Sequence, residues 1–346
     1  MPGEDRMNLK ELNSVALAMT SNGKGILAAD ESSPTIKKRF DTIDTESTEE
    51  NRRRYREMII TAEGAEDYIG GVIMFDETLR QATSDGVPFA KYMSDLGMVP
   101  GIKVDTGAKP LAGFPGETIT EGLDGLRDRL AEYSELGARF AKWRAVINIG
   151  EDIPSDFCQH ANAHALARYA ALCQEAAIVP IVEPEVLMDG AHSIGRCEEV
   201  TNAALDALFG QLAAHRVALE GIVLKPNMVI SGSDAQDRAS PAEVAEATLR
   251  SLKAHVPAEV PGIAFLSGGQ TAEEATEHLG LMNQMGPLPW ELSFSYGRAL
   301  QAPALDAWRG KEENYGAGQA ALFKRAKLNS LAHLGTYETS MESEAA

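Results

Sequence analysis

Charged side chains interrupt four apolar segments of this 346-residue sequence. They are Lys103, Lys142, Glu183 and Lys225, and each lies toward the carboxyl end of its segment. A strand buried in a parallel sheet is expected to be almost continuously apolar, so charge at these places needs a reason. In a barrel of parallel strands the carboxyl ends carry the active site. The pattern therefore predicts that these four residues take part in chemistry.

Each of the four has a polar residue two positions further along the chain. Side chains two residues apart on a strand face the same way, so each pair shares one face. If these faces point inward, lysines, arginine and carboxylates converge in one cavity. The pairs are Lys103 with Asp105, Lys142 with Arg144, Glu183 with Glu185, and Lys225 with Asn227.

Interior lysines can act as nucleophiles. A lysine that is partly desolvated and close to other cations has a lowered pKa, and its neutral amine can attack a ketone. Spacing alone leaves open which of Lys103, Lys142 and Lys225 has this role. Lys225 follows an apolar run and is followed by Pro226, which ends the strand. Two other interpretations stay open: structural ion pairs such as Lys142 with Glu183, and a Lys225 side chain that extends to solvent.

Two segments have features of a phosphate site. Residues 266–270 (LSGGQ) follow the seventh expected strand and open a helix, and residues 295–298 (SYGR) follow the eighth. Backbone N–H groups of a glycine-rich turn bind phosphate well, and the Arg298 guanidinium can bind it through two N–H groups. Loops after strands seven and eight are the usual phosphate site of barrel enzymes. Together with the interior cations, they would attract an anionic substrate.

The elements that must position these residues are eight short segments rich in Val, Ile and Phe, which alternate with helical patterns. Such alternation is typical of βα units, and eight units favour a closed barrel. The sequence predicts an α/β fold, a (β/α)₈ TIM barrel, as a single domain over residues 8–335, with a polar, mobile tail over residues 336–346. The expected strands are 25–29, 69–75, 99–105, 139–147, 179–186, 221–229, 262–267 and 292–297.

The composition excludes several classes of partner. The formal net charge of −19 would repel nucleic acid from most of the surface. The densest basic stretch, residues 51–56, follows an acidic stretch and is typical of a helix start, so no nucleic-acid partner is expected. The three cysteines are not closely spaced, which favours reduced thiols. No apolar segment has the length of a membrane span or the pattern of a signal, so we expect a cytoplasmic protein without membrane contact.

Motifs for nucleotides and metals are weak. Gly23 and Gly25 lack the third glycine of a dinucleotide-binding motif, and no P-loop occurs. His160 and His164 stand four residues apart and could share a metal, but they lie in an alanine-rich helical pattern far along the chain from the charged strand ends. We therefore expect no metal and no cofactor.

Over nearly the whole chain, from Leu9 to Tyr337, the sequence resembles the class I fructose-bisphosphate aldolases. The resemblance rests on ordered motifs: GKGILAADES (23–32), GIKVD (101–105), FAKWR (140–144), VEPE (182–185), LKPNM (224–228), LSGGQ (266–270) and SYGRAL (295–300). It implies reversible aldol cleavage of fructose 1,6-bisphosphate to dihydroxyacetone phosphate and glyceraldehyde 3-phosphate, in glycolysis and gluconeogenesis. It also implies a (β/α)₈ barrel and a homotetramer that needs no metal.

The resemblance implies a role for each site residue. Lys225 forms the Schiff base with the C2 ketone, and Glu183 is the general acid and base for carbinolamine dehydration and for the C4 hydroxyl. Asp30 and Lys142 assist proton transfer and carbon–carbon cleavage, while Glu185 shapes the local charge. The phosphate nearer C1 binds at Ser267, Gly268, Gly269, Ser295, Gly297 and Arg298. The other phosphate lies toward Arg39, Arg52 and Lys103, and Arg144 adds to the basic pocket.

The chain departs from the family pattern in two places. Members of its best-known branch end in a tyrosine that folds over the site, whereas Tyr337 is the nearest tyrosine to the end here, which leaves the preference for bisphosphate over monophosphate open. Ser33-Pro34 replaces a common Thr-Gly pair, and proline fixes φ and lacks an N–H. Two rival functions also stay open: another Schiff-base lyase or transaldolase, and a non-enzymatic scaffold on the same fold.

Overall fold

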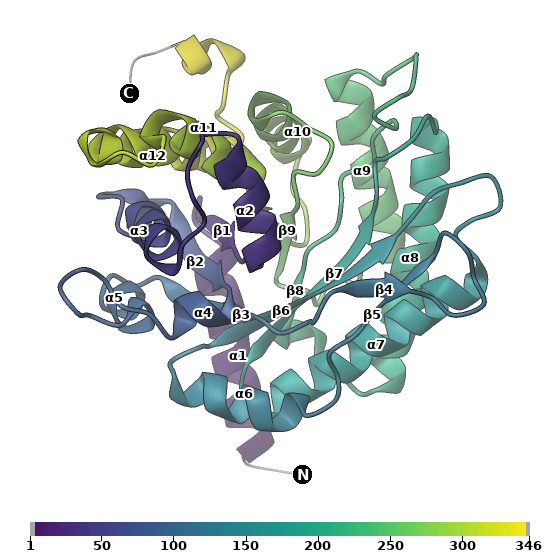
Figure 1. Cartoon of the computed structure of the whole chain (residues 1–346). Coiled ribbons are helices and arrows are strands. Elements are labelled where there is room, and N and C mark those ends of the chain that lie inside the picture. The colour runs from purple at the N-terminus through teal and green to yellow at the C-terminus, as the bar shows by residue number, and fades with distance from the viewer. Residues whose placement is uncertain (1–3, 344–346) are drawn as a thin grey trace.

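The chain forms a closed barrel of parallel strands surrounded by helices (Figure 1). The computed structural model describes residues 4–343. Around the barrel the strand order is β1-β10-β9-β8-β7-β6-β3-β2, which confirms the predicted (β/α)₈ fold. The barrel strands are β1 (Gly25–Ala29), β2 (Ile69–Met74), β3 (Val99–Lys103), β6 (Phe140–Ile147), β7 (Val179–Val186), β8 (Val223–Leu224), β9 (Gly262–Phe265) and β10 (Glu291–Tyr296).

The helices begin and end largely where sequence signals favour it. The capping boxes at Ser240 and Thr271 both form, and each sets the start of its helix. The helices are α1 (Glu4–Thr20), α2 (Ser33–Asp41), α3 (Glu49–Ile60), α4 (Asp76–Leu79), α5 (Phe89–Asp95), α6 (Leu126–Glu135), α7 (Asp156–Glu175), α8 (Ile194–Ala214), α9 (Pro241–His255), α10 (Ala272–Gln284), α11 (Arg298–Trp308) and α12 (Tyr315–His333). None of the helices within residues 4–343 combines the length and apolar character required to cross a membrane.

One end of the barrel interior is apolar. Side chains from the first halves of the strands pack together there, and they include Ile26, Phe140 and Val223. Helix α1 adds Leu12 and Met19 to the same cluster. This packing leaves the carboxyl ends of the strands as the polar end, which is where the interrupting charges lie.

Three expected strands end at least two residues earlier than predicted, and one of them is β9, which ends at Phe265. The strand β8 contains only Val223 and Leu224, and β3 ends at Lys103. Lys225 nevertheless continues the barrel pairing, because its N–H donates to the carbonyl of Val182 at 2.9 Å. A short antiparallel hairpin, β4 (Ala108–Pro110) and β5 (Thr118–Thr120), follows β3 and was not predicted.

The basic stretch in α3 pairs with carboxylates. Each of its arginines has an acidic partner, and the pairs are Arg52 with Glu77, Arg53 with Glu50 and Glu57, Arg54 with Glu312, and Arg56 with Glu31. Thr48 caps the helix by accepting a hydrogen bond from the Asn51 N–H. These contacts favour the interpretation of residues 51–56 as part of a structural helix start over a nucleic-acid patch.

The polar C-terminal stretch packs against the barrel as far as it is described. Tyr337 is buried, and its hydroxyl donates to Glu342 Oε1 at 2.9 Å. Glu342 forms an ion pair of 2.6 Å with the buried Arg325 of α12, and residues 339–343 form a short 3₁₀ helix. The expected mobile tail over 336–346 is therefore attached up to Ser343, and its last three residues lie outside the described ones.

Close packing inside the barrel predicts a clear effect of a small substitution. A methyl group at Gly101 of β3 would overlap the ring of Phe140, whereas Gly210 of α8 faces open space. Gly101→Ala should lower the free energy of unfolding by about 1–3 kcal/mol through overpacking. Gly210→Ala should raise it by roughly 0.5–1 kcal/mol, because alanine favours the helix. Urea unfolding measures both values, and equal effects of the two changes would contradict this packing.

Candidate active site

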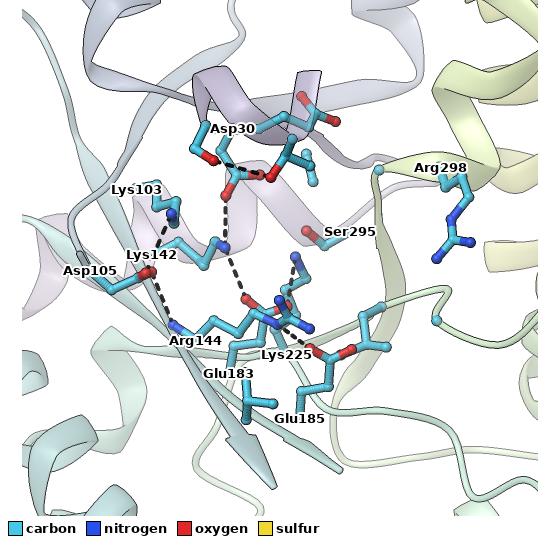
Figure 2. Close-up of a pocket in the computed structure, with 18 of the residues that line it drawn as sticks. Asp30, Lys103, Asp105, Lys142, Arg144, Glu183, Glu185, Lys225, Ser295 and Arg298 are labelled. Atoms are coloured by element: carbon cyan, nitrogen blue, oxygen red, sulfur yellow. Dashed lines mark hydrogen bonds and ion pairs between the residues drawn. The ribbon is translucent and has the colours of Figure 1, made fainter. Parts of the chain in front are cut away.

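A cavity of about 390 Å³ opens at the carboxyl ends of the barrel strands. Of the fifteen site residues predicted from the sequence, all except Arg52 and Gly269 line it. Figure 2 shows Lys142, Glu183 and Lys225 near its centre, with Lys103 and Arg298 on opposite sides. The charged faces of the strands thus point inward, and the alternative of a Lys225 side chain directed to solvent is wrong.

A row of alternating charges crosses the centre of the cavity. Lys142 Nζ lies 2.7 Å from Asp30 Oδ2 and 3.2 Å from Glu183 Oε2. The other carboxylate oxygen, Glu183 Oε1, lies 3.1 Å from Lys225 Nζ. Lys142, Glu183 and Lys225 are each at most 4% exposed. The predicted structural pair between Lys142 and Glu183 is therefore present, but Glu183 bridges two lysines.

The charges of this row stabilise one another. Burial alone would lower the pKa of Lys142, but Asp30 and Glu183 outweigh it and raise that pKa. Burial opposes ionisation of the acids, yet Lys142 and Lys225 hold the pKa values of Asp30 and Glu183 below their usual range. Lys142 therefore lacks the lowered pKa that the sequence analysis expected of the nucleophilic lysine. It stays an ammonium ion at neutral pH, so it is a poor nucleophile.

The pKa values of the two glutamates of β7, Glu183 and Glu185, are shifted in opposite directions. Burial raises the pKa of Glu185, and the nearby charge of Glu183 raises it further, while Arg144 opposes the shift. Arg144 Nε donates to Glu185 Oε2, so one oxygen of Glu185 is satisfied by a cation. Two carboxyl groups whose pKa values are shifted in opposite directions can act as a general base and a general acid.

On the Lys103 side of the cavity, Asp105 organises the cations. Lys103 Nζ lies 3.4 Å from Asp105 Oδ1, and the Arg144 backbone N–H donates to Asp105 Oδ2 at 3.4 Å. Asp105 Oδ1 also accepts a hydrogen bond of 3.1 Å from the N–H of Gly107. Asp105 lines the cavity although it was not among the predicted site residues, and its position two residues after Lys103 was the available signal.

The opposite side presents groups that suit a phosphate. Ser267, Gly297 and Arg298 line the cavity there, and the buried hydroxyl of Ser295 has no hydrogen-bond partner among residues 4–343. An unsatisfied buried hydroxyl that faces a cavity is ready to bind a ligand oxygen.

The two glycines of the 266–270 turn have a packing role as well. A methyl group on Gly268 or on Gly269 would overlap the side chain of Met188, and Gly269 has a φ of +73°. Gly268 lines the cavity, but Gly269 does not. The sequence indicated close approach of a phosphate, whereas packing against Met188 and a left-handed backbone already require glycine here.

Two predicted arginines behave differently from expectation. Arg52 was expected near the second phosphate, but its guanidinium forms two hydrogen bonds with Glu77, at 2.7 and 2.6 Å, outside the cavity. Arg39 does line the cavity, but a methyl group on Gly297 would lie 3.8 Å from its Nη2. Arg39 therefore belongs with Arg298 and not with Lys103.

The Ser33-Pro34 departure is explained by the start of α2. Ser33 and Pro34 occupy the first turn of the helix, where proline is favoured because its missing N–H has no intrahelical partner. Ser32 and Thr35 line the cavity with hydroxyls 3.1 Å apart, and the sequence analysis had not selected them. Hydroxyl residues at a helix start directly after Asp30 were the signal that could have identified them.

Other reactive residues lie outside this cavity. The three cysteines are buried, and burial raises the pKa of Cys158 to about 11. His160 and His164 lie on α7, and His160 Nδ1 bonds to the carbonyl of Asp156. Within residues 4–343, no three His, Cys, Asp or Glu residues are arranged to hold a metal ion.

Comparison with known proteins agrees with this geometry. Residues 11–346 match the family described as fructose-bisphosphate aldolase class-I. The chain belongs to this family. It is 61% identical to a probable fructose-bisphosphate aldolase class 1 of Xanthomonas campestris, over 96% of this chain and 100% of that protein. It is 54% identical to the cytosolic fructose-bisphosphate aldolase 4 of Arabidopsis thaliana, over 95% of this chain and 84% of that protein.

A solved structure of the same family has the same fold. It is fructose-bisphosphate aldolase from Plasmodium falciparum, in complex with TRAP and a small-molecule inhibitor, and it matches with a TM-score of 0.94 at 47% identity. The match covers 96% of each chain. The barrel is thus shared with a solved aldolase structure and is not peculiar to this sequence.

A buried histidine supports the glycine-rich turn of this aldolase fold. His278 Nδ1 lies 2.7 Å from Gln270 Oε1, at the end of the turn. Burial lowers the pKa of His278 to about 4, and the nearby Arg238 adds to this shift while Glu274 opposes it. His278 is therefore neutral at pH 7, with Nδ1–H donating to Gln270.

This histidine predicts acid sensitivity. Between pH 6.5 and pH 4 the unfolded chain binds a proton at His278 that the folded chain resists, so stability falls as pH falls through this window. The contribution of His278 to the free energy of unfolding should decrease by roughly 2–3 kcal/mol from pH 7 to pH 4.5. Urea unfolding of His278→Gln should show a smaller decrease, with the exposed His160→Gln as control. An unchanged decrease in His278→Gln would contradict the assignment.

Proposed function

We propose that this protein cleaves fructose 1,6-bisphosphate reversibly to dihydroxyacetone phosphate and glyceraldehyde 3-phosphate, through a Schiff base on Lys225, in glycolysis and gluconeogenesis. One observation carries the proposal: the buried Glu183 carboxylate contacts Lys142 through one oxygen and Lys225 through the other. A proton acceptor that touches the nucleophilic amine is what Schiff-base chemistry requires.

Lys225 is the favoured nucleophile for physical reasons as well. The raised pKa of Lys142 keeps that amine protonated. Lys103 lies to one side of the cavity and contacts Asp105, which binds two backbone N–H groups in addition. Lys225 contacts the carboxylate at the centre of the cavity. Lys142 and Lys225 both combine burial with contact to Glu183, and Lys225 is favoured because Asp30 and Glu183 together hold Lys142 in its protonated form.

The steps follow from these positions. Lys225 Nζ gives one proton to Glu183 and then forms a bond to the C2 carbonyl carbon, while a second amine proton passes to the oxygen and makes it the carbinolamine hydroxyl. Glu183 donates the proton it received as that hydroxyl leaves as water, which gives the iminium and restores the carboxylate. The carboxylate then takes the proton of the C4 hydroxyl, the C3–C4 bond breaks, and its electron pair moves into the enamine. Lys142 stabilises ionised Glu183 and Asp30 near the breaking bond.

The ends of the cavity suit the two phosphates of the substrate. We assign one phosphate to Arg298, Ser267, Ser295, Gly268 and Gly297, and we add Arg39, which lies close to Gly297. Lys103 and Arg144 are assigned to the other. Binding at both ends holds the C3–C4 bond against the acids and lysines at the centre. Arg52 and Gly269 are proposed only as structural support.

The iminium serves as the electron sink, so we propose that the reaction uses no metal and no cofactor. We also propose a cytoplasmic location, because relatives in Arabidopsis thaliana are named cytosolic. The three buried free thiols are compatible with a reducing compartment.

Kinetics of lysine variants test the proposal. Lys225→Met should lower kcat for fructose 1,6-bisphosphate by at least about 10³-fold, because the covalent intermediate cannot form. Glu183→Gln should lower it by about 10²–10⁴-fold through loss of proton transfer. The exposed Lys253→Met is the matched control, and a chelator should leave the wild-type rate unchanged. Cleavage that survives Lys225→Met, or that needs a metal, would refute the mechanism.

We propose further that the protein is a homotetramer, as the resemblance implies. An exposed aromatic pair is compatible with this: Phe157 is 54% exposed and stacks on Phe114 at 4.8 Å between ring centroids. Aromatic side chains are enriched at protein interfaces. Light scattering should give the mass of four chains, and Phe157→Asp should shift it toward smaller species. A wild-type mass of one chain would contradict the assembly.

A further inference from the structure

A buried group of charges lies directly behind Arg39. Glu31 Oε1 lies 2.5 Å from Arg39 Nη1, and Glu31 Oε2 lies 2.6 Å from Arg56 Nη1. Gln301 Nε2 donates to Glu31 Oε1 at 2.8 Å, and Gln301 Oε1 accepts from the Tyr55 hydroxyl at 2.9 Å. Arg39 and Glu31 line the cavity, whereas Arg56 does not.

The charges in this group do not balance. Without Arg56, Glu31 and Arg39 would form a neutral pair, and Arg39 would have little net charge to offer a phosphate. Arg56 supplies the second positive charge, so the group of Arg56, Glu31 and Arg39 has a net charge of +1. Arg56 is 2% exposed, so solvent screens its charge only weakly.

The location of Arg56 is hard to explain by stability alone. A buried arginine is costly unless it is paired, and a carboxylate that already binds one arginine does not need a second for charge balance. Arg56 also lies 5.7 Å from the ring centroid of Tyr55, and its Nη2 donates to the Glu31 carbonyl at 3.3 Å. These contacts hold the guanidinium beside Glu31 Oε2, whereas Arg39 lies at Oε1.

We propose that Arg56 is a positioning residue that neutralises Glu31 and thereby leaves Arg39 free to bind a substrate phosphate. This inference rests on the proposed function, since it deepens the account of the same phosphate site. Arg56 touches no substrate. It acts through Glu31, which holds the Arg39 guanidinium beside Gly297.

Three variants and the wild type separate charge from structure, because the two single variants change the net charge of the group and the double variant restores it. The count is +1 in the wild type, 0 in Arg56→Met, +2 in Glu31→Gln, and +1 again in the double variant. The KM for fructose 1,6-bisphosphate and the Kd for inorganic phosphate, from calorimetry, are measured for each. Arg56→Met should raise both constants by about tenfold, with a smaller effect on kcat.

The double variant decides the proposal. Charge counting predicts that it returns both constants to within about twofold of the wild type, whereas a purely structural role predicts a double variant at least as impaired as Arg56→Met. Arg56→Lys should keep wild-type constants, and Arg54→Met is the control for loss of one charge from the same helix. Unchanged constants in Arg56→Met, or a double variant without recovery, would overturn the proposal.

Two further outcomes remain informative. If Arg56→Met does not fold, the other two variants still test the inference. Glu31→Gln must bind phosphate at least as tightly as the wild type, and the double variant must bind it as tightly as the wild type. Weaker binding by either variant refutes the inference. If the wild type does not cleave the bisphosphate, the proposed function fails. The calorimetric Kd for phosphate still tests the charge count in that case.

Discussion

The burial of Glu183 is the constraint on which the rest of the site depends. An ionised carboxylate that is 3% exposed is unfavourable by several kcal/mol unless cations replace the lost water. Lys142 of β6 and Lys225, directly after β8, do so from the strands on the two sides of β7, one at each oxygen. Asp30 in turn compensates Lys142. Each charge needs the next one, so the row can exist only where several strand ends meet.

The barrel supplies that meeting place by separating two kinds of interior. Apolar side chains with α1 fill one end, and the other end holds the charged row beneath an open cavity. The packed apolar end fixes the strand positions, and the backbone hydrogen bond from Lys225 to Val182 extends the strand pairing to Lys225, the proposed nucleophile. A phosphate at each side would then place the reacting carbons over Glu183. The apolar end of the barrel thus stabilises the fold, and the charged end holds the residues proposed for catalysis.

Much of this was predictable from the sequence, and the failures share a physical cause. Apolar segments that alternate with helical patterns predicted the barrel, and charges within those segments predicted the cavity. Both signals depend on residues that are close together in the sequence. The raised pKa of Lys142 could not be predicted, since it depends on which charges lie nearest in space. Arg52 and Arg39 were assigned to one phosphate through the family resemblance, yet Glu77 and Glu31 decide where their guanidiniums lie. The packing of Tyr337 with Glu342 had no sequence signal.

In the proposed mechanism Lys225, and no other lysine of the cavity, binds the substrate carbon. The most direct measurement is reduction with borohydride in the presence of dihydroxyacetone phosphate, followed by proteolysis and mass spectrometry of the modified peptide. The account predicts a single adduct on Lys225, because Lys142 remains protonated between Asp30 and Glu183. An adduct on Lys142 or Lys103, or no adduct at all, would contradict it.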